Sequence, residues 1–412
     1  MAKKPISASK SKPASKKPVP KKPASKKPAS KKPVPKKPAS KKPVPKKPAS
    51  KARTESTPKP RKWDSATLLV LPGLVLVIFG EVAARVSPAW VPWLAPAAYV
   101  YGLAYPLLAV GTVWRLTSFR WLKSLGPFAV LLLTWPSFSH VFSVGLSKPD
   151  VAVSEDSFEV TTFNVRRLDE FEWLDGDQTR EDIATWLAEQ PDGIWCFQEF
   201  PKRGKATLRS VGFSWLKPRR RLFTWPREAG PALASSYPVK DWTTYMFEDE
   251  GAGRGRVLQA DVETPAGMVR VFNVHLQSLH FDHADYDAVE EGPSREEGAR
   301  LWGLITNASK ARALQAQELV RRMEESPYPV IVAGDFNDTP MSYAMHALRG
   351  SRVEDTFVAA SWGSGGTHLG AIPGLRIDGI LADTTLQCVS HDTHRVELSD
   401  HRPVTAVLQA IR

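Results

Sequence analysis

The stretch Val330-Ile331-Val332-Ala333-Gly334-Asp335-Phe336-Asn337 decides the fold that we expect for this chain. Its first four residues are apolar and mostly β-branched, which is typical of a strand buried on both faces. Asp335 and Asn337 follow the end of this strand. One acid after a strand is usually a turn or cap residue. The segment therefore indicates a functional site only if other strands end in the same way.

Other apolar runs in the C-terminal part of the chain also border polar groups. These groups are Asn164 after Phe158–Phe163, Glu199 after Ile194–Phe197, His275 after Val269–Val274, and Asp400 and His401 before Pro403–Leu408. Carboxylate and amide oxygens suit Mg²⁺, Mn²⁺ or Ca²⁺. Histidines beside them can donate to a phosphate and carry the charge that develops on it. We therefore expect one rim lined with oxygen ligands and imidazoles.

From Ser154 onward, strand-like runs alternate with helical patterns, which indicates a layered α/β domain. Further strands are expected at Val257–Val262 and Ile377–Leu381. Three helices are expected. In the first, Thr179 and Asp182 resemble a capping box ahead of the apolar face of Ile183, Trp186 and Leu187. In the second, apolar residues repeat at helical spacing, namely Ala316, Leu319, Val320 and Met323, and the third lies near Asp338–Leu348 with Pro340 in its first turn.

Six motifs, in this order, resemble the endonuclease/exonuclease/phosphatase superfamily. They are Phe163-Asn164-Val165, Gln198-Glu199, Asn273-Val274-His275-Leu276, Gly334-Asp335-Phe336-Asn337, Arg376-Ile377-Asp378 and Ser399-Asp400-His401-Arg402-Pro403-Val404. The pattern from Asp335 to Tyr343, together with three preceding apolar stretches, resembles the bacterial membrane-anchored branch. The resemblance implies a four-layered α-β-β-α sandwich over residues 154–412, and metal-dependent hydrolysis of phosphate esters.

The resemblance also implies roles for the site residues. Glu199 would be the principal ligand of Mg²⁺ or Mn²⁺, with Ca²⁺ as a further candidate, and Asn164 and Asp400 would lie beside it. In the reaction, Asp335 would orient or deprotonate the attacking water, and Asn337 would position water or phosphate. His401 would donate to the phosphate, and Asp378 would orient a histidine. His275 would be a second phosphate-facing imidazole.

Two residues are weaker candidates for binding the substrate. Arg166 follows the first motif and would contact the phosphate or form a surface ion pair. Thr367, in Gly365-Gly366-Thr367, would lie at the site or in a simple turn. The two cysteines, Cys196 and Cys388, lack metal-ligand spacing and lie in apolar runs, so we expect buried free thiols, although a bridge between them stays open.

Residues 1–62 form a tail of a different composition. They contain 23 Lys or Arg and one acid, Glu55, so they carry +22, and because the whole chain carries +13, the other 350 residues carry −9. The repeated Lys-Lys-Pro units block helices and sheets and repel one another, which predicts disorder. The tail is either a solvated spacer or a basic arm that binds anionic lipid or nucleic acid.

Residues 63–147 are the predicted membrane anchor. Uncharged stretches of 16, 29 and 24 residues lie between Asp64 and Glu81, between Arg85 and Arg115, and between Lys123 and Lys148. A spanning helix needs about 20 apolar residues, so we expect three spans, the first of them weak. The preceding tail is too long for a cleaved signal peptide. A buried helical hairpin of a soluble domain is the alternative.

Positive charge predicts the orientation of these spans. The tail is basic, and the loop between the second and third stretches carries Arg115, Arg120 and Lys123, so both are expected in the cytoplasm. The hydrolase domain then lies outside the cytoplasm of a bacterial cell, attached to the cell membrane. If the first stretch does not insert, the domain lies inside.

The substrate class stays open among phosphoesters because fold does not fix function. A nuclease or phosphodiesterase is the first interpretation, and an enzyme acting on phospholipid or sphingolipid headgroups is the second. The second would use exposed apolar loops near the rim, for which Leu222–Trp225 is a candidate. A non-catalytic membrane adaptor that works through its basic arm is the third.

Overall fold

A computed structural model describes residues 64–145, 152–170, 174, 178–204, 206–207, 221–226, 228–247, 251–281, 283–370 and 374–411. The described residues all belong to one compact unit, residues 61–412. The predicted disordered tail, residues 1–62, lies outside the described residues. The unit of residues 61–412 holds the apolar helices and the predicted hydrolase domain together.

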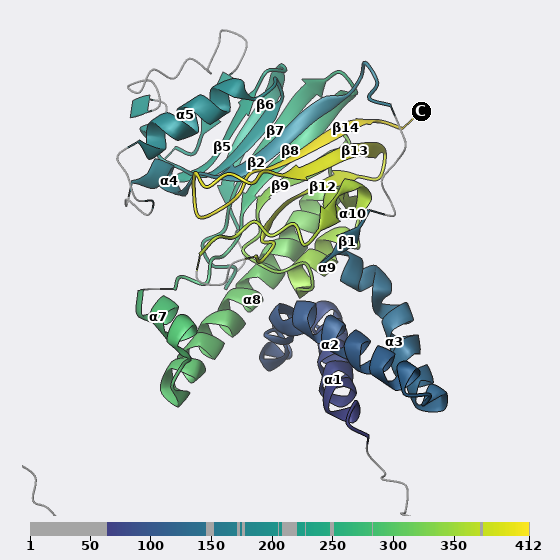
Figure 1. Cartoon of the computed structure of the whole chain (residues 1–412). Coiled ribbons are helices and arrows are strands. Elements are labelled where there is room, and N and C mark those ends of the chain that lie inside the picture. Colours follow the sequence, from purple (N-terminus) through teal and green to yellow (C-terminus); the bar gives the residue numbers. More distant parts are fainter. Residues whose placement is uncertain are drawn as a thin grey trace, which may run out of the picture. The chain divides into compact units, whose positions relative to one another are not determined.

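Two six-stranded sheets lie face to face in the C-terminal part (Figure 1). The first consists, in spatial order, of β13 (Leu386–Thr393), β14 (Val404–Ala410), β2 (Phe158–Asn164), β3 (Ile194–Phe200), β5 (Gly230–Ser235) and β4 (Arg221–Thr224). The second consists of β10 (Val353–Asp355), β12 (Asp378–Asp383), β9 (Val330–Asp335), β8 (Gly267–His275), β7 (Arg256–Thr264) and β6 (Val239–Met246). In each sheet one neighbouring pair is parallel, β2 with β3 and β8 with β9, whereas the other pairs are antiparallel.

Alternating side chains of the central strands form the core. In β9, Ile331 and Ala333 join the cluster between the two sheets, whereas Val330 and Val332 join a cluster on the outer face. All six residues of β9 are buried, as expected for a strand covered on both sides. The unbroken apolar run of the sequence is explained by this double burial.

Helices complete the outer layers. On the first sheet, α5 (Thr179–Glu189) packs Ile183 and Leu187 against β2 and β3. On the second sheet, α8 (Arg295–Glu324) and α9 (Tyr343–Arg349) pack against β8 and β9. The predicted α-β-β-α sandwich is thus observed. The described part of the sandwich and its connections also contains α4 (Arg166–Asp169), α7 (His283–Glu291), α10 (Thr356–Ala360), and a ribbon of β1 (Ser143–Val144) with β11 (Trp362–Gly363).

Three helices precede the sandwich, namely α1 (Thr67–Arg85), α2 (Ala97–Thr117) and α3 (Trp121–Ser139), with a short turn η1 (Pro92–Leu94) before α2. Among the described residues, two segments are long and apolar enough to cross a membrane, Thr67–Arg85 and Pro92–Thr117, with mean hydropathy 2.2 and 1.4. The prediction ranked the first stretch as the weak one, but it is the more apolar of the two. The third helix forms, yet it does not reach the same threshold, so three spans stay a prediction.

Several local predictions are wrong. Thr179 begins α5 instead of capping it, and Gln178 at the cap position makes no side-chain capping bond. The capping box lies at Ser294 and Glu297 instead, at the start of α8. Pro340 precedes α9, whose cap is Ser342.

The apolar segment Leu222–Trp225 also departs from its prediction. It is not an exposed loop, because most of it belongs to the edge strand β4 and Trp225 is buried. Cys196 and Cys388 are buried free thiols, as predicted.

Candidate active site

The two parallel strand pairs bring the predicted polar residues to one end of the sandwich. Within the sheets, Asn164 on β2 pairs with Gln198 on β3, and His275 on β8 pairs with Asp335 on β9. The sheets meet where Asn164 Nδ2 donates to Asp335 Oδ2 over 3.0 Å, with both side chains buried. Carboxyl ends of parallel strands collect at one edge, which is where ligands bind in many α/β proteins.

A second buried contact between the sheets lies below this rim. Gln198 Nε2 donates to Asn273 Oδ1 at 2.8 Å, and Asn273 Nδ2 donates to the carbonyls of Phe197 and Ala232 at 3.0 and 2.8 Å. Buried amides with paired donors specify one arrangement of neighbouring strands. These two motif residues therefore fix the register of the sheets under the site.

The backbone at the rim adopts unusual conformations. Glu199 and Asn337 have φ of +50° and +52°, a region that non-glycine residues rarely occupy. At Gly334 a Cβ would lie 2.0 Å from the Val274 carbonyl oxygen, so another residue would not fit. Asn337 is held by its own amide, which donates to Asp335 Oδ1 at 2.8 Å, and by Nδ2, which donates to the Leu276 carbonyl at 3.1 Å. Such strain at a rim is typical of functional sites.

His401 and Asp378 form a buried pair. His401 Nδ1 lies 2.8 Å from Asp378 Oδ2, and His401 Nε2 lies 3.9 Å from Asp335 Oδ2. Thr367 supports the pair from below, because its Oγ1 accepts the amides of Ile377 and Asp378, each at 3.1 Å. Thr367 therefore lies at the site, but it holds the backbone of the pair and its hydroxyl is already engaged.

The surrounding charges shift the pKa values of this group. Burial lowers the pKa of His401, but the carboxylates of Asp378, Asp335 and Asp400 outweigh it, and the pKa ends well above its usual value. Burial, together with the charge of Asp378, raises the pKa of Asp335. An imidazolium bonded through Nδ1 to a carboxylate keeps its Nε2–H free to donate towards a substrate.

His275 lies across the site from this pair. Its Nε2 is 3.7 Å from Asp335 Oδ2 and 3.9 Å from Glu199 Oε1. The Glu199 side chain is 34% exposed, so it can reach a ligand from solvent. His275 therefore connects Glu199 with Asp335.

Asp400 and Arg166 form an ion pair at the rim, with Arg166 Nη1 2.5 Å from Asp400 Oδ2. The Arg166 amide also donates to Asn164 Oδ1 at 3.0 Å. Arg166 stands in a turn of positive φ that continues to Asp169. Two of the three predicted metal ligands, Asn164 and Asp400, are thus engaged by Arg166 in this structure.

The residues can hold a divalent cation, although the tightest group differs from the predicted one. Asp335, Asp378 and His401 offer ligand atoms within 4.8 Å of one another. Asp378 Oδ1 is buried and has no hydrogen-bond partner among the described residues, so one carboxylate oxygen is left for a cation or a donor. A protonated His401 has no lone pair for a metal, however, so in that state His401 and Asp378 form a hydrogen-bonded pair instead of a shared metal site.

One imidazole at the site has no counterpart in the sequence prediction. His368 packs edge-on against His401 with ring centroids 5.4 Å apart, and the two residues pair as a β-bridge. Burial and the charge of His401 lower the pKa of His368 to about 4, so a neutral imidazole stands beside a charged one. The sequence offered one indication of His368 as a site residue, namely its position directly after Thr367.

Comparison with known proteins defines the class. A model of the endonuclease/exonuclease/phosphatase family matches residues 161–401. The match spans more than half of the chain and every motif position from Asn164 to His401. The chain therefore belongs to the endonuclease/exonuclease/phosphatase family, and this membership supports hydrolysis of phosphoesters.

Solved structures of similar fold include an endonuclease/exonuclease/phosphatase from Bacteroides vulgatus, with 22% identity, a TM-score of 0.46, and coverage of 62% of this chain and 99% of that one. The mannosyl-6-phosphatase Bt3783 of Bacteroides thetaiotaomicron shares 17% identity, with a TM-score of 0.45 and coverage of 61% and 99%. TDP2 from C. elegans shares 17%, with a TM-score of 0.44 and coverage of 63% and 77%. No curated protein matches the chain in sequence.

Proposed function

We propose that this protein is a divalent-metal-dependent phosphoester hydrolase, a nuclease or phosphodiesterase, held at a membrane by its N-terminal helices. The observation that carries the proposal is the buried pair of His401 and Asp378, 3.9 Å from the Asp335 carboxylate that Asn164 holds. A charged imidazole beside a carboxylate provides a proton donor and a base in one site.

The side chains suggest separate roles. Asp335, with its raised pKa, orients or deprotonates the attacking water, and Asn337 positions the water or the phosphate. His401 donates to the phosphate as charge develops on it, and Asp378 orients the His401 ring. His275 faces the same carboxylates and is the second donor to the phosphate.

We propose Glu199 as the principal ligand of Mg²⁺ or Mn²⁺, with Asn164 beside it. Asp400 would join this set only after exchanging its contact with Arg166, which would then contact the phosphate. A bound divalent cation neutralises a phosphate oxygen and lowers the pKa of water. Acidic residues alone would repel the substrate.

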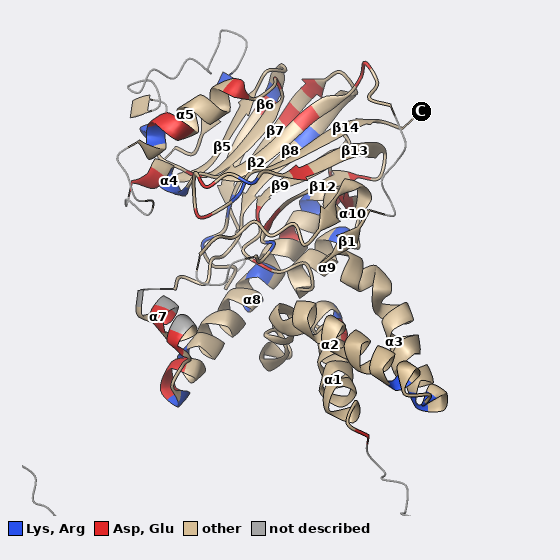
Figure 2. Ribbon diagram, in the orientation of Figure 1, with Lys and Arg blue, Asp and Glu red and all other residues tan. Residues whose placement is uncertain are grey.

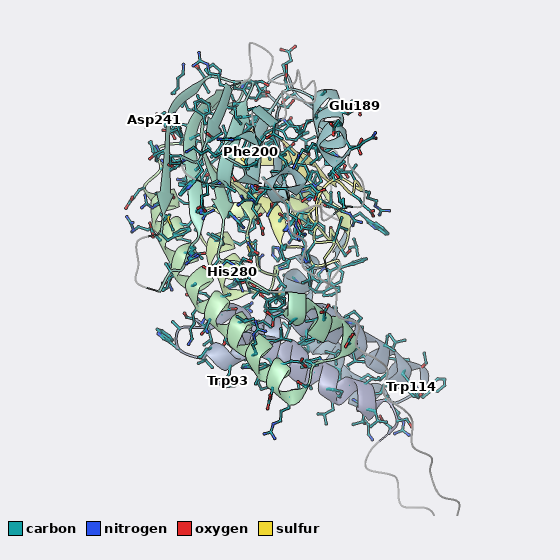
Figure 3. All side chains as sticks on the ribbon, turned by 90° about the vertical axis from the view of Figure 1, so that its left-hand side faces the viewer. Trp93, Trp114, Glu189, Phe200, Asp241 and His280 are labelled. Atoms are coloured by element: carbon teal, nitrogen blue, oxygen red, sulfur yellow. The ribbon has the colours of Figure 1, made fainter. Side chains whose placement is uncertain are left out.

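The membrane proposal is based on exposed apolar surface. Leu122 and Leu133 of α3 and Leu103 of α2 are 86%, 80% and 78% exposed, and the three helices carry little charge along their length (Figure 2). Contiguous exposed apolar surface often marks a site that contacts a membrane or another protein. Trp93 and Trp114 stand at opposite ends of the α2 segment (Figure 3), as an interfacial belt would require.

A lipid phosphoester is the second candidate substrate, because an apolar pocket adjoins the site. Its lining combines Asn337 and His368 of the site with Leu279, Phe281, Ile377 and Tyr99, the last from α2. A substrate with an acyl chain would find apolar contacts between the reacting centre and the helices.

The full chain, purified in a mild detergent with Mg²⁺ or Mn²⁺, should be tested against a bis-aryl phosphodiester, nicked plasmid and sphingomyelin. Turnover of at least one substrate is expected, with loss in EDTA. Asp335→Ala should abolish turnover, while Asp287→Ala, an exposed acid on α7, is the matched control. Turnover of none of them by folded protein would favour the non-catalytic adaptor.

A further inference from the structure

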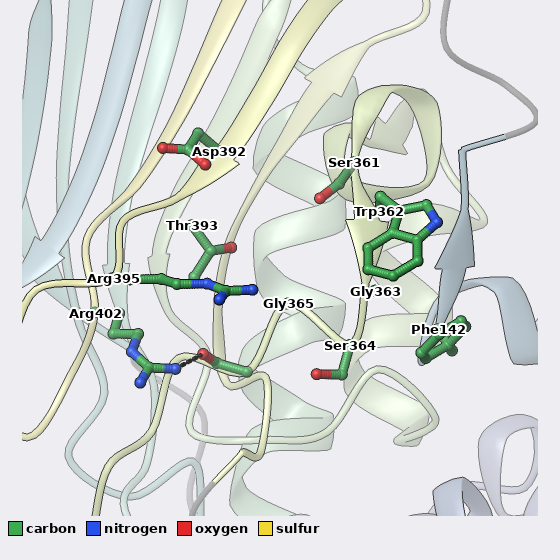
Figure 4. A pocket seen from close by; sticks show the side chains of 11 residues that line it. Phe142, Ser361, Trp362, Gly363, Ser364, Gly365, Asp392, Thr393, Arg395 and Arg402 are labelled. Atoms are coloured by element: carbon green, nitrogen blue, oxygen red, sulfur yellow. Dashed lines mark hydrogen bonds between the residues drawn. The ribbon is translucent and has the colours of Figure 1, made fainter.

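A cavity of about 470 Å³ lies outside the candidate active site, near the end of α3. Its lining comes from three separate parts of the chain (Figure 4). The residues are Phe142 after α3, the segment Ser361–Gly366, and Asp392, Thr393, Arg395 and Arg402 of the β13–β14 connection and its neighbourhood.

Two arginines give the cavity its charge. Arg395 and Arg402 point into the space from the same side (Figure 4). Neither has a carboxylate partner among the residues that the structure describes, and Arg402 Nη1 donates only to the Gly366 carbonyl, at 3.3 Å. Arg402 Nε is buried without a hydrogen-bond partner there. Asp392, the one acid of the lining, lies 3.4 Å from His394. The site therefore has excess positive charge and an unused donor.

Backbone amides and aromatic rings also border the cavity. Within the described part of the chain, the amides of Gly365 and Gly366 have no acceptor, and Gly365 has φ of +58°. Successive free amides in such a turn form a concave anion site. Phe142 and Trp362 meet edge to face at 6.3 Å beside the loop, so the cavity has an apolar border on the side of α3.

The extended chain separates this cavity from the active site. His401 and Arg402 are neighbours in a segment paired with Thr367 and His368, and successive side chains of extended backbone point to opposite sides. His401 faces Asp378, whereas Arg402 faces the cavity. The cavity is therefore a distinct site that shares one backbone segment with the catalytic pair.

We propose that this cavity binds the phosphate group of an anionic ligand, either a phospholipid headgroup or a soluble phosphate. Arginine forks and free amides are the donors that recognise phosphate. The aromatic border and the place at the end of α3 fit a lipid whose chains continue along the helices.

Binding to the full chain in non-ionic detergent with EDTA tests the proposal, by calorimetry with dihexanoylphosphatidylglycerol, dihexanoylphosphatidylcholine and inorganic phosphate. Phosphatidylglycerol should bind at least tenfold more tightly than phosphatidylcholine, because choline would face the arginines. Arg395→Gln and Arg402→Gln should each weaken binding roughly tenfold. Saturable binding of inorganic phosphate with the same dependence on the arginines identifies a soluble ligand, and its failure to bind identifies the lipid headgroup.

Two controls locate the bound group. Arg321→Gln, an exposed arginine of α8 paired with Glu325, should leave binding unchanged, as should His275→Ala in the active site. Arg395 is exposed, so its variant keeps the test valid even if Arg402→Gln fails to fold. Equal binding of the two lipids, binding insensitive to Arg395→Gln, or loss of binding in His275→Ala would each overturn the proposal.

Discussion

His401 is surrounded by three carboxylates, of which Asp378 is hydrogen-bonded at 2.8 Å while Asp335 and Asp400 lie at 3.9 and 4.0 Å. This surrounding raises the pKa of the imidazole, and the contact with Asp378 leaves Nε2 as the ring nitrogen that could donate to a ligand. The neighbouring His368 stays neutral because it is buried next to that charge. The site thus contains two imidazoles in different protonation states.

Replacing Asp378 with Asn should reduce kcat roughly 10²-fold, because a neutral amide neither stabilises the imidazolium charge nor orients the ring as well as a carboxylate does. KM should change little. Asp383→Asn, on the same strand but away from the site, is a folding control, since Asp383 binds Arg352 instead. Steady-state kinetics on a soluble diester checks the prediction. An effect confined to KM would contradict the orienting role of Asp378.

The pH profile of kcat/KM should have two limbs. The alkaline limb reflects loss of the His401 proton and should lie well above the ordinary histidine pKa of about 6.5, since the pKa of His401 is raised. The acidic limb reflects protonation of Asp335 and should lie above the ordinary aspartate range, since that pKa is also raised. His401→Gln should remove the alkaline limb, and an unchanged limb would argue against His401 as donor.

The same shift affects stability with a definite sign. Because the folded pKa of His401 exceeds its unfolded value, the stabilisation is complete below about pH 6.5 and disappears as pH rises through the folded pKa. The free energy of unfolding of the wild type should therefore fall as pH becomes alkaline. In His401→Gln this part of the pH dependence should be missing. Denaturant unfolding at several pH values measures this difference.

Between elements, the apolar helices are hydrogen-bonded to the loop that follows β9. Arg312 of α8 is fully buried, and its Nε donates to Asp338 Oδ2 at 2.8 Å while Nη2 donates to Tyr99 OH of α2 at 2.9 Å. Thr339 Oγ1 also donates to the Ala98 carbonyl at 3.3 Å. Asn337 lies one residue before Asp338, so α2 supports the loop after β9 that carries Asn337.

The end of α3 supports the segment that precedes Asp378 in the same way. Arg376 holds Asp355 with both terminal nitrogens, at 3.2 and 2.6 Å, and its Nη2 also donates to the His140 carbonyl at 2.8 Å. Arg376 stands two residues before Asp378. The helices are therefore part of the support for the site, and a hydrolase domain cut free of them would lose these partners.

Tyr99→Phe should cost about 1 kcal/mol of stability, because Arg312 loses one buried acceptor. It should also lower kcat several-fold through the Asp338 loop. Tyr105→Phe is the matched control, because its hydroxyl donates to the Leu131 carbonyl of α3 and not to Arg312. Equal kcat values for the two variants would show that α2 does not position the catalytic loop.

At the scale of the whole unit, residues 61–412, the helices have two different ends. Asp64, at the start of α1, gathers Arg115, Arg120 and Lys123 at 3.3, 3.1 and 3.8 Å. The other end meets the sandwich through Tyr99 and His140. Positive residues thus collect at the end opposite to the hydrolase domain, which agrees with a cytoplasmic location of the charged end.

A periplasmic-activity reporter fused after Arg412 should therefore be active, and a cytoplasmic reporter at the same position inactive. The expectation depends on three helices crossing the membrane. Replacing Arg120 and Lys123 by Gln should raise the fraction of molecules in the opposite orientation, because the positive bias is weakened. A cytoplasmic signal from the wild-type fusion would exclude the three-span arrangement.

The sequence by itself determined the strands that carry the site. The runs ending in Asn164, Glu199, His275 and Asp335 are predicted because burial on both faces demands apolar, β-branched residues and leaves the polar ones at the ends. It also determined the two kinds of chemistry, oxygen ligands and imidazoles. Edge strands such as β4 and β10 escaped prediction, since a short, half-buried strand has no such continuous pattern.

Tertiary structure alone decided which of these groups meet. The pairing of Asn164 with Asp335, the engagement of Asp400 by Arg166 and the arrival of His368 beside His401 join residues 33 to 234 positions apart. No local pattern encodes such distances, because they follow from how two sheets pack and cross. The same holds for Tyr99 under the catalytic loop, since only the packed molecule shows that the apolar helices and the active site support each other.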